Sequence, residues 1–377
     1  MKKMWMIPSL MLSGIAPAFA QSSVTLYGIV DTGVEYVSHA NAAGDSVVRM
    51  PSITGSFPSR WGIRGAEDLG GGLKAVFVLE NGFNTRGGDI GQGGRLFGRQ
   101  AWVGLQSTYG TLSFGRQYTM TYLALLENDV IGPAIYSLGS LDAYVPSARS
   151  DNTVSYKGTF SGLTIGATYS FGRDSAGTGN SPGQGTCVGA VPGDFQQCHQ
   201  WSAMLKYDVN HFGAVLSYDQ QRGGTNAAAN FFDGFPARPI TSSGDKDTRI
   251  QANAYFSYAG AKVSAGWLGR LVESSNEAVA SVRSDIYYLG AQYFFTPSFI
   301  VDGEVYRALN AQHDTRATLG TIRATYLLSR STAIYAQSGY LANSARARYS
   351  VSAGGGGTTP ASGSNQTGLL LGMRHLF

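Results

Sequence analysis

Two features are scarce in this sequence. After the first twenty residues it contains no run of about 18 apolar residues, the minimum for a helix that crosses a membrane. Charged residues make up only 14% of the chain, against roughly 25% in soluble proteins. The first shortage excludes a helical membrane protein, and the second is unusual for a soluble globular protein.

The first twenty residues differ from the rest of the chain. MKKMWMIPSLMLSGIAPAFA has two early lysines, an apolar stretch and small residues before Gln21, the pattern of a secretory signal peptide. A membrane anchor is the alternative, but the stretch is too short and contains a proline. We expect residues 1–20 to be the signal peptide and 21–377 the mature domain. Of 28 Lys and Arg, removal of two leaves 26 against 24 Asp and Glu, so nothing favours nucleic acid as a partner.

Only two cysteines are present, Cys187 and Cys198. Because an exported chain meets an oxidising compartment, we expect a disulfide that closes a small loop. Metal binding is the weaker interpretation, since only His199 is adjacent and the spacing fits no common zinc site. No HExxH or GxSxG motif occurs. The sequence therefore predicts no cofactor, no metal and no enzymatic activity.

Alternation of apolar and polar residues runs through the chain. In LTIGATYSF one face is Leu, Ile, Ala, Tyr and Phe, and the other is small or polar, as in a β-strand with one apolar face. With 21 Tyr and 51 Gly, this favours a transmembrane β-barrel, in which apolar residues are spread over many strands. A soluble β-sandwich is the alternative, but the aromatic residues cluster at strand ends, as at a membrane interface.

Short connections alternate with long ones, which is typical of an up-and-down meander. Marking strands between them predicts an all-β, antiparallel transmembrane barrel of sixteen strands. Because lipid offers no hydrogen-bonding partners, the sheet must close. The last strand, 365–377, should therefore pair with the first, 22–37, with Phe377 on the lipid-facing side.

The third long connection, 119–148, is apolar, whereas the other long loops are rich in Gly, Ser, Asn and Thr. Such a segment is costly to expose to water, so we expect it to fold into the barrel. An oligomer contact or a short surface helix is the alternative. Its acidic residues Glu127, Asp129 and Asp142 should then face the remaining water.

Basic residues on the inward phase of the strands should lie opposite this loop. Placing Trp61 and Ile63 outward puts Arg60 and Arg64 in the lumen, and placing Trp102 outward puts Arg99 there. The same rule assigns Arg149 and Lys157 to the lumen, whereas Arg116 needs a β-bulge to reach it. An arginine wall facing carboxylates is how a pore selects ions; solvated charges or structural ion pairs are the alternative.

The runs SRWGIRGAEDLGGGLKAVFVLENGF and LFGRQAWVGLQSTYGTLSFGRQYT, the start SVTLYGIVDTGVEY and the terminal HLF together resemble the general diffusion porins of β-proteobacteria. The resemblance covers essentially the whole mature chain. It implies a trimeric outer-membrane barrel, with the third long loop as a constriction and the 85–97 loop as a latch to a neighbour. It also implies that the terminal aromatic residue, here Phe377, helps the barrel assembly machinery to recognise the chain.

The family's arginine ladder matches Arg60 in SRWG, Arg99 in GRQA and, less closely, Arg149. Close relatives often have arginine where this chain has Ser155, which weakens the expected anion preference. The PEFG-type loop motif of enterobacterial porins is absent, and GPAIYSLG stands in its place.

The sequence thus predicts an outer-membrane channel for passive diffusion of ions and small hydrophilic solutes, with weak charge selectivity. A solute-specific porin is an alternative within transport. A barrel enzyme and an adhesin acting through its surface loops are alternatives of other classes. Outer-membrane lipid, other copies of the chain and small solutes are the expected partners.

Overall fold

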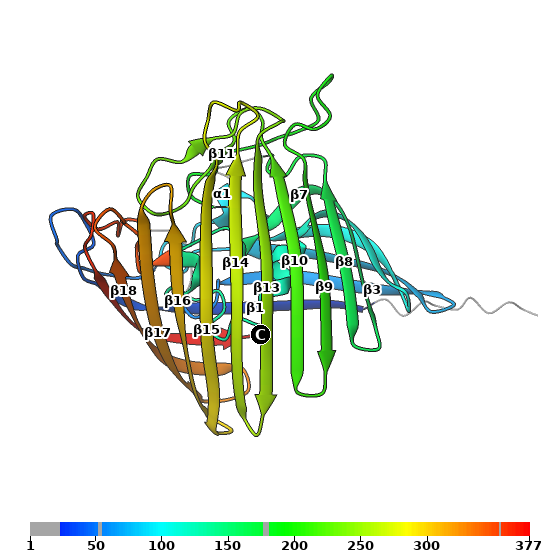
Figure 1. Cartoon of the computed structure of the whole chain (residues 1–377). Coiled ribbons are helices and arrows are strands. Elements are labelled where there is room, and N and C mark those ends of the chain that lie inside the picture. The colour runs from blue at the N-terminus through cyan, green and yellow to red at the C-terminus, as the bar shows by residue number, and fades with distance from the viewer. Residues whose placement is uncertain (1–22, 52–54, 176–180, 354–355) are drawn as a thin grey trace, which may run out of the picture.

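A closed antiparallel β-barrel is the architecture of this protein (Figure 1). The computed structural model describes residues 23–51, 55–175, 181–353 and 356–377, so the predicted signal peptide lies outside the described residues. The sheet closes because residues 29–37 of β1 (Ser23–Val37) pair antiparallel with β19 (Gln366–Leu376). The sixteen-strand barrel and the pairing of the first strand with the last are both confirmed.

The other barrel strands follow in chain order, each paired antiparallel with its neighbours. They are β3 (Arg60–Gly70), β4 (Leu73–Gly82), β5 (Gln100–Ser107), β6 (Gly110–Tyr118), β7 (Arg149–Phe160), β8 (Leu163–Ser170), β9 (Gln200–Val209), β10 (Phe212–Arg222), β13 (Lys246–Tyr258), β14 (Ala261–Glu273), β15 (Val282–Thr296), β16 (Phe299–Asn310), β17 (Thr315–Leu327) and β18 (Thr332–Asn343).

The long loops carry the remaining short elements. These are the strands β2 (Val47–Arg49), β11 (Ala228–Ala229) and β12 (Arg238–Pro239), the helical turns α1 (Gly91–Gly94) and α2 (Met120–Leu125), and the 3₁₀ turns η1 (Leu138–Ser140) and η2 (Val145–Ser147). No helix among the described residues is long and apolar enough to cross a membrane.

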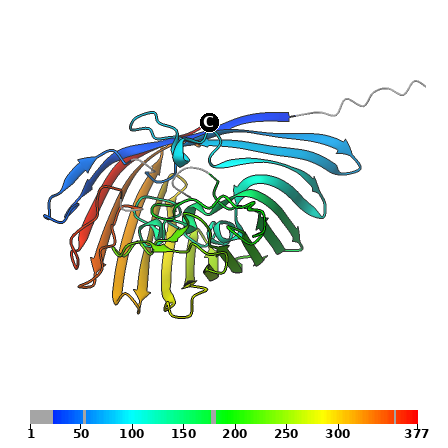
Figure 2. The same ribbon diagram turned by 90° about the horizontal axis from the view of Figure 1, so that it is seen from above.

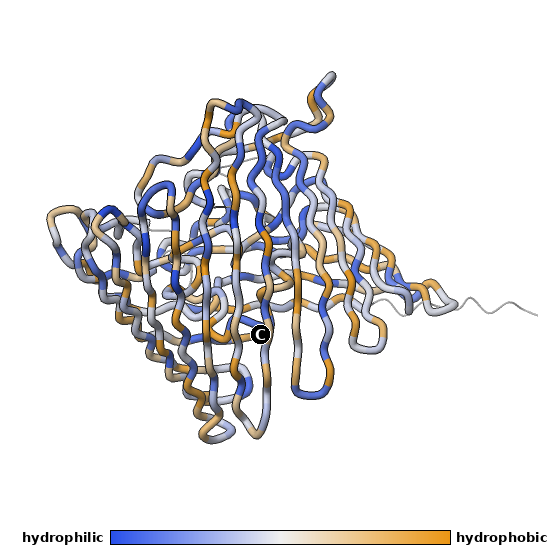
Figure 3. Tube along the Cα trace, viewed as in Figure 1, coloured by the Kyte–Doolittle hydropathy of each residue, from blue (hydrophilic) through white to orange (hydrophobic). Residues whose placement is uncertain are grey.

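Apolar and polar residues alternate along strands of the barrel wall (Figure 3), and successive side chains of a strand point to opposite faces. On β19, Leu369, Leu371 and Met373 are exposed on the outer face, whereas Leu370 is buried inside. The predicted lipid-facing side of the last strand is confirmed. The outer apolar side chains contact lipid rather than water, which is typical of a transmembrane barrel.

Short turns lie at one end of the barrel and long loops at the other (Figure 1). Viewed from above, the strands form a ring and loop segments lie inside it (Figure 2). The connection 119–148, hereafter the inward loop, is one of these segments, because its apolar side chains pack against the inner wall of the barrel. The predicted inward folding is confirmed.

The seam between β1 and β19 has no room for a side chain at its centre. Gly33 lies opposite Gly372, and a Cβ atom on Gly33 would lie 2.4 Å from the carbonyl oxygen of Leu371. Since that contact is with backbone, relief would require the two strands to separate. The glycine therefore permits the close approach that seals the barrel.

We expect Gly33→Val to weaken the closing seam and to destabilise the barrel by about 1–3 kcal/mol, as overpacking does in a protein core. The measurement is the temperature at which the folded barrel loses its compact mobility on a denaturing gel. Gly320→Val is the matched control, because a Cβ atom on Gly320 meets nothing within 4 Å. Equal transition temperatures for the two variants would contradict this role of Gly33.

Candidate functional site

The inward loop is held by its apolar side chains against one part of the barrel wall. Its residues Leu125, Ile135, Tyr136, Leu138 and Leu141 form a buried cluster with side chains of β14 to β19. At its start, Met120 and Ala124 pack on β9 and β10. Burial of this area removes from water the surface that made the loop unsuitable for the exterior.

Polar side chains of the wall hold the backbone of the inward loop. Gln251 donates to the carbonyl of Thr121 at 3.0 Å, and Gln337 donates to the carbonyl of Tyr136 at 3.2 Å. The guanidinium of Arg323 donates to the carbonyl of Ile131 at 3.1 Å. These bonds satisfy backbone groups that a buried irregular segment would otherwise leave unpaired.

Two predicted arginines, one on β3 and one just before β5, meet at one carboxylate of β4. Glu80 lies on the lumen face of β4, opposite Gly62 and Gln100. Its two oxygens lie 2.7 Å from Nε of Arg99 and 3.5 Å from Nε of Arg60. The hydroxyl of Tyr27 donates to the same carboxylate at 3.0 Å, so Glu80 sets the position of both arginines.

Tyr118 extends this group to the third predicted arginine. Its hydroxyl accepts from Arg99 at 2.6 Å and from Arg149 at 3.4 Å, and Arg149 also lies over the Tyr118 ring at 4.8 Å. Tyr122 of the inward loop stacks on Tyr118 with ring centroids 3.9 Å apart. The arginine cluster (Arg60, Arg99, Arg149 with Glu80 and Tyr118) is thereby joined to the loop.

The cluster carries excess positive charge, because three guanidinium groups stand against one carboxylate. Arg99 and Arg149 are 3% and 4% exposed, whereas the side chain of Arg60 is 22% exposed. Arg60 is therefore the member in contact with solvent, and the other two contribute through their electric field, which is screened little when charges are buried.

The predicted orientation of Trp102 is wrong. Trp102 pairs with Val78, which itself pairs with Arg64, so Trp102 lies on the lumen phase. Arg99 nevertheless reaches the lumen, because it lies at a bend just before β5, where strict alternation does not apply.

Two other predicted basic residues lie on the lumen phase but outside the cluster. Arg64 is exposed and lies over the ring of Tyr27, with 5.3 Å between its Cζ and the ring centroid. Lys157 is exposed on β7, opposite Thr111 of β6. Both are available to solvent in the barrel interior.

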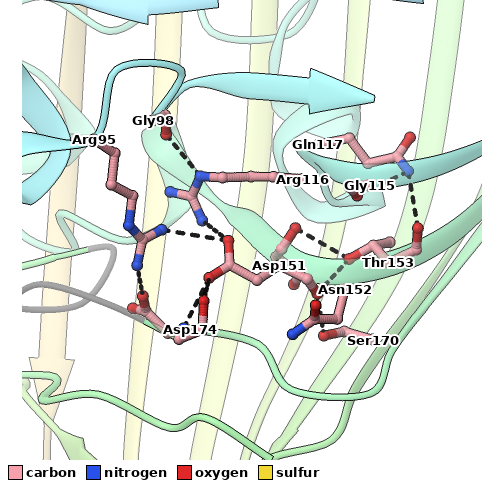
Figure 4. A network of polar contacts seen from close by, with 12 residues as sticks. Arg95, Gly98, Gly115, Arg116, Gln117, Asp151, Asn152, Thr153, Ser170 and Asp174 are labelled. Carbon is pink, nitrogen blue, oxygen red and sulfur yellow. Dashed lines mark hydrogen bonds and ion pairs between the residues drawn. The ribbon is translucent and has the colours of Figure 1, made fainter. Parts of the chain in front are cut away.

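Arg116 lies at an irregularity of strand pairing between Gly115 and Gln117, where the sequence required a bulge. Its Nη1 lies 2.5 Å from Asp151, and its Nε donates to the carbonyl of Gly98. Arg95 binds Asp151 and Asp174 in the same network (Figure 4). Arg116 therefore ties loops to the wall, which is the structural role that the sequence left as its alternative.

The predictions that Asp129 and Asp142 of the inward loop face open water are wrong, because both side chains are buried. Asp129 is buried: it accepts from the hydroxyl of Tyr306 at 3.2 Å and from the backbone of Gly132. Burial raises the pKa of its carboxyl. Asp142 is 2% exposed and lies 3.1 Å from Nε of Arg249 and 3.7 Å from Nη1 of Arg270.

Glu127 is the exposed acidic residue of the inward loop, with 57% of its side chain accessible. It forms an ion pair with Lys206 of β9, and its carbonyl accepts from Lys262 of β14. The structure thus brings none of the three acidic loop residues to the arginine cluster. The carboxylate at the cluster is Glu80, on the wall itself.

Cys187 and Cys198 are joined by a disulfide, and both are buried. They pack with Ala227, Phe231 and Ile240 of the next long loop. The disulfide thus helps to join two loops at the mouth of the barrel.

Comparison with known proteins agrees with this geometry. The profile of the Gram-negative porins matches residues 9–346. The chain belongs to the Gram-negative porin family. It is 31% identical to outer membrane porin protein 32 of Delftia acidovorans, over 97% of both chains. It is 35% identical to an outer membrane porin protein of Bordetella pertussis, over 71% of each.

Solved structures agree as well. The anion-selective porin from Comamonas acidovorans has a TM-score of 0.75 at 26% identity, covering 95% of this chain and all of the other. OmpT of Vibrio cholerae in its trimer form has a TM-score of 0.64 at 14% identity, over 94% of this chain and 99% of the other, which shows the shared fold. This porin is an outer-membrane protein that forms a channel for passive diffusion.

Sequence reasoning missed Glu80 and Tyr118, which organise the porin's arginine cluster. Glu80 could have been found from the strand phase, because LENGF places it opposite Gly62 in the turn-connected pair β3–β4. Tyr118 gave no such signal. Its contacts with Arg99 and Arg149 depend on three segments that meet only in the folded barrel.

Glu80→Gln should shift the porin's ion selectivity toward anions, because it removes the carboxylate of the cluster. It should also destabilise the barrel by roughly 3 kcal/mol, since Arg99 is left buried without its counter-charge. Reversal potential in a planar bilayer and thermal unfolding in detergent measure the two effects. Glu67→Gln, at an exposed position of the same hairpin, should change neither; unchanged selectivity in Glu80→Gln would refute the argument.

Asp142→Asn should loosen the inward loop, because it removes the carboxylate that holds Arg249 and Arg270. We expect more frequent spontaneous closures in single-channel records, since a segment with weaker anchoring samples other positions more often. Glu127→Gln is the control, because its ion pair is partly exposed and contributes little. Equal closure frequencies in both variants would show that Asp142 does not anchor the loop.

Proposed function

We propose that this porin favours small anions and that the arginine cluster is the element that selects them. The observation that carries the proposal is the meeting of Arg60, Arg99 and Arg149 around one carboxylate, so that three positive charges stand against one negative charge. Arg64 and Lys157 add positive charge on the same inner face. Charged side chains lining a narrow passage are a common basis of ion selectivity.

The position of the inward loop supports this proposal. The loop packs against β14 to β19 and touches the cluster through Tyr122. A solute that passes the loop therefore passes the field of the arginines. The anion selectivity of the Comamonas relative is consistent with the same mechanism, in which the channel performs no chemical step and needs no cofactor or metal.

We also propose that the mature chain begins at Gln21 and assembles as a homotrimer in outer-membrane lipid. The loop at 85–97 supports self-association, because Ile90 and Leu96 are 44% and 54% exposed there, and exposed apolar side chains favour a protein contact. The trimer form of the Vibrio protein shares the fold. Phe377, whose backbone pairs with Gly28, remains our candidate for recognition by the barrel assembly machinery.

The test is the reversal potential of purified protein in a planar bilayer under a KCl gradient. We expect stepwise conductance with anion preference in the wild type and loss of that preference in Arg60→Ala/Arg99→Ala, because the cluster then carries no excess positive charge. Arg330→Ala, at an exposed turn between β17 and β18, is the matched control. A shift of gel mobility on heating verifies that each variant is folded.

Conductance with the same selectivity in the double variant would keep the channel but exclude these arginines as its filter. Absence of conductance from a folded barrel would contradict the channel function and would favour a barrel enzyme or an adhesin.

A further inference from the structure

A cavity of about 160 Å³ lies at the loop end of the barrel, away from the arginine cluster. Three segments line it: Ser140 of the inward loop, Asn230, Phe232, Gly234 and Phe235 between β10 and β13, and Arg348, Ser350 and Thr359 between β18 and β19. Its volume is below the roughly 300–1,000 Å³ of sites for drug-sized ligands, so it suits a small molecule.

Arg348 supplies the charge of the cavity. Its Nε donates to the carbonyl of Pro360 at 3.1 Å, and its backbone N–H donates to the carbonyl of Asp233 at 2.9 Å. A Cβ atom on Gly234 would lie 2.5 Å from Cβ of Arg348, so the glycine lets the arginine stem lie against this turn. Among the described residues, no carboxylate lies within ion-pair distance of Arg348.

The side chain of Asp233, whose backbone carbonyl accepts from Arg348, is engaged elsewhere. The carboxylate of Asp233 lies 2.6 Å from Nδ1 of His313. It also accepts hydrogen bonds from the hydroxyl of Thr315 at 3.0 Å and from the backbone N–H of Phe235 at 3.2 Å. Its carboxylate therefore cannot turn to neutralise Arg348 without breaking this set. The cavity keeps an uncompensated cation, which favours an anionic occupant.

Two aromatic side chains supply the apolar part of the lining. Phe235 stacks on His313, with ring centroids 4.4 Å apart, which fixes the orientation of its ring. Phe232 has a backbone φ of 60°, a conformation rare for a bulky residue. Its N–H donates to the side chain of Asn230 at 2.8 Å. Strained residues concentrate at ligand sites, and here the strain places a second ring at the cavity.

We propose that this cavity binds a small aromatic carboxylate, with the carboxylate on Arg348 and the ring against Phe232 and Phe235. The proposal deepens the proposed channel function and rests on it, because Ser140 of the inward loop lines the same cavity. An occupant would lie on the approach to the constriction and would give the channel a saturable preference for this solute class.

The experiment is single-channel recording in KCl with benzoate added on the side of the long loops. We expect benzoate to reduce the current in a saturable manner in the wild type. The half-blocking concentration should rise about ten-fold in Arg348→Ala, the loss expected for one charge-assisted hydrogen bond. Arg330→Ala, at the opposite end of the barrel, should be blocked by benzoate like the wild type and should keep the wild-type current in KCl alone, and Phe235→Leu should weaken the block.

Equal block by benzamide would overturn the choice of an anion, and equal block by glucose would assign the cavity to a sugar instead. An open channel without block, or equal block in Arg348→Ala, would overturn the site while leaving the proposed channel intact. If the protein does not conduct, saturation-transfer NMR can measure benzoate binding to the wild type and to Arg348→Ala in detergent. This measurement tests the binding site independently of the channel. Loss of binding in the variant would support the site, and unchanged binding would overturn it.

Discussion

Pairing of every backbone group in a medium without water is the constraint on which this structure depends. An open sheet edge in lipid would leave a row of unpaired N–H and C=O groups, so β19 must return to β1. Gly33 and Gly372 meet at that seam, where a side chain would hold the strands apart. The closed wall then gives the molecule an interior, and the inward loop and the arginine cluster lie on its inner face.

Closure also creates the place for the inward loop. A segment this apolar would be costly at the cell surface, but inside the barrel its side chains pack on β14 to β19. Its backbone, which has little regular structure of its own, takes partners from wall residues such as Gln251 and Arg323. The loop narrows the lumen as a consequence of satisfying both its apolar and its polar groups.

The charges inside the barrel separate into two kinds. Asp142 with Arg249, and Asp129 with Tyr306, lie behind the loop and hold it to the wall. Arg60, Arg99 and Arg149 lie where the loop touches the wall through Tyr122 and keep an excess of positive charge. The same residue types thus serve as anchors where carboxylates match them and as a source of field where carboxylates are outnumbered.

Alternation and apolar composition are local properties of the chain, and they were enough to predict the barrel, the closing strand pair, the inward loop and the inner phase of Arg60. The orientation of Trp102 could not be predicted in this way, because a large aromatic residue does not by itself fix the phase of its strand, and Trp102 lies on the lumen side. Nor did the sequence determine that Glu80, rather than the acidic residues of the inward loop, meets the arginines. Ion-pair partners far apart in sequence are decided by strand register and by how the loop packs, and only the tertiary structure specifies both.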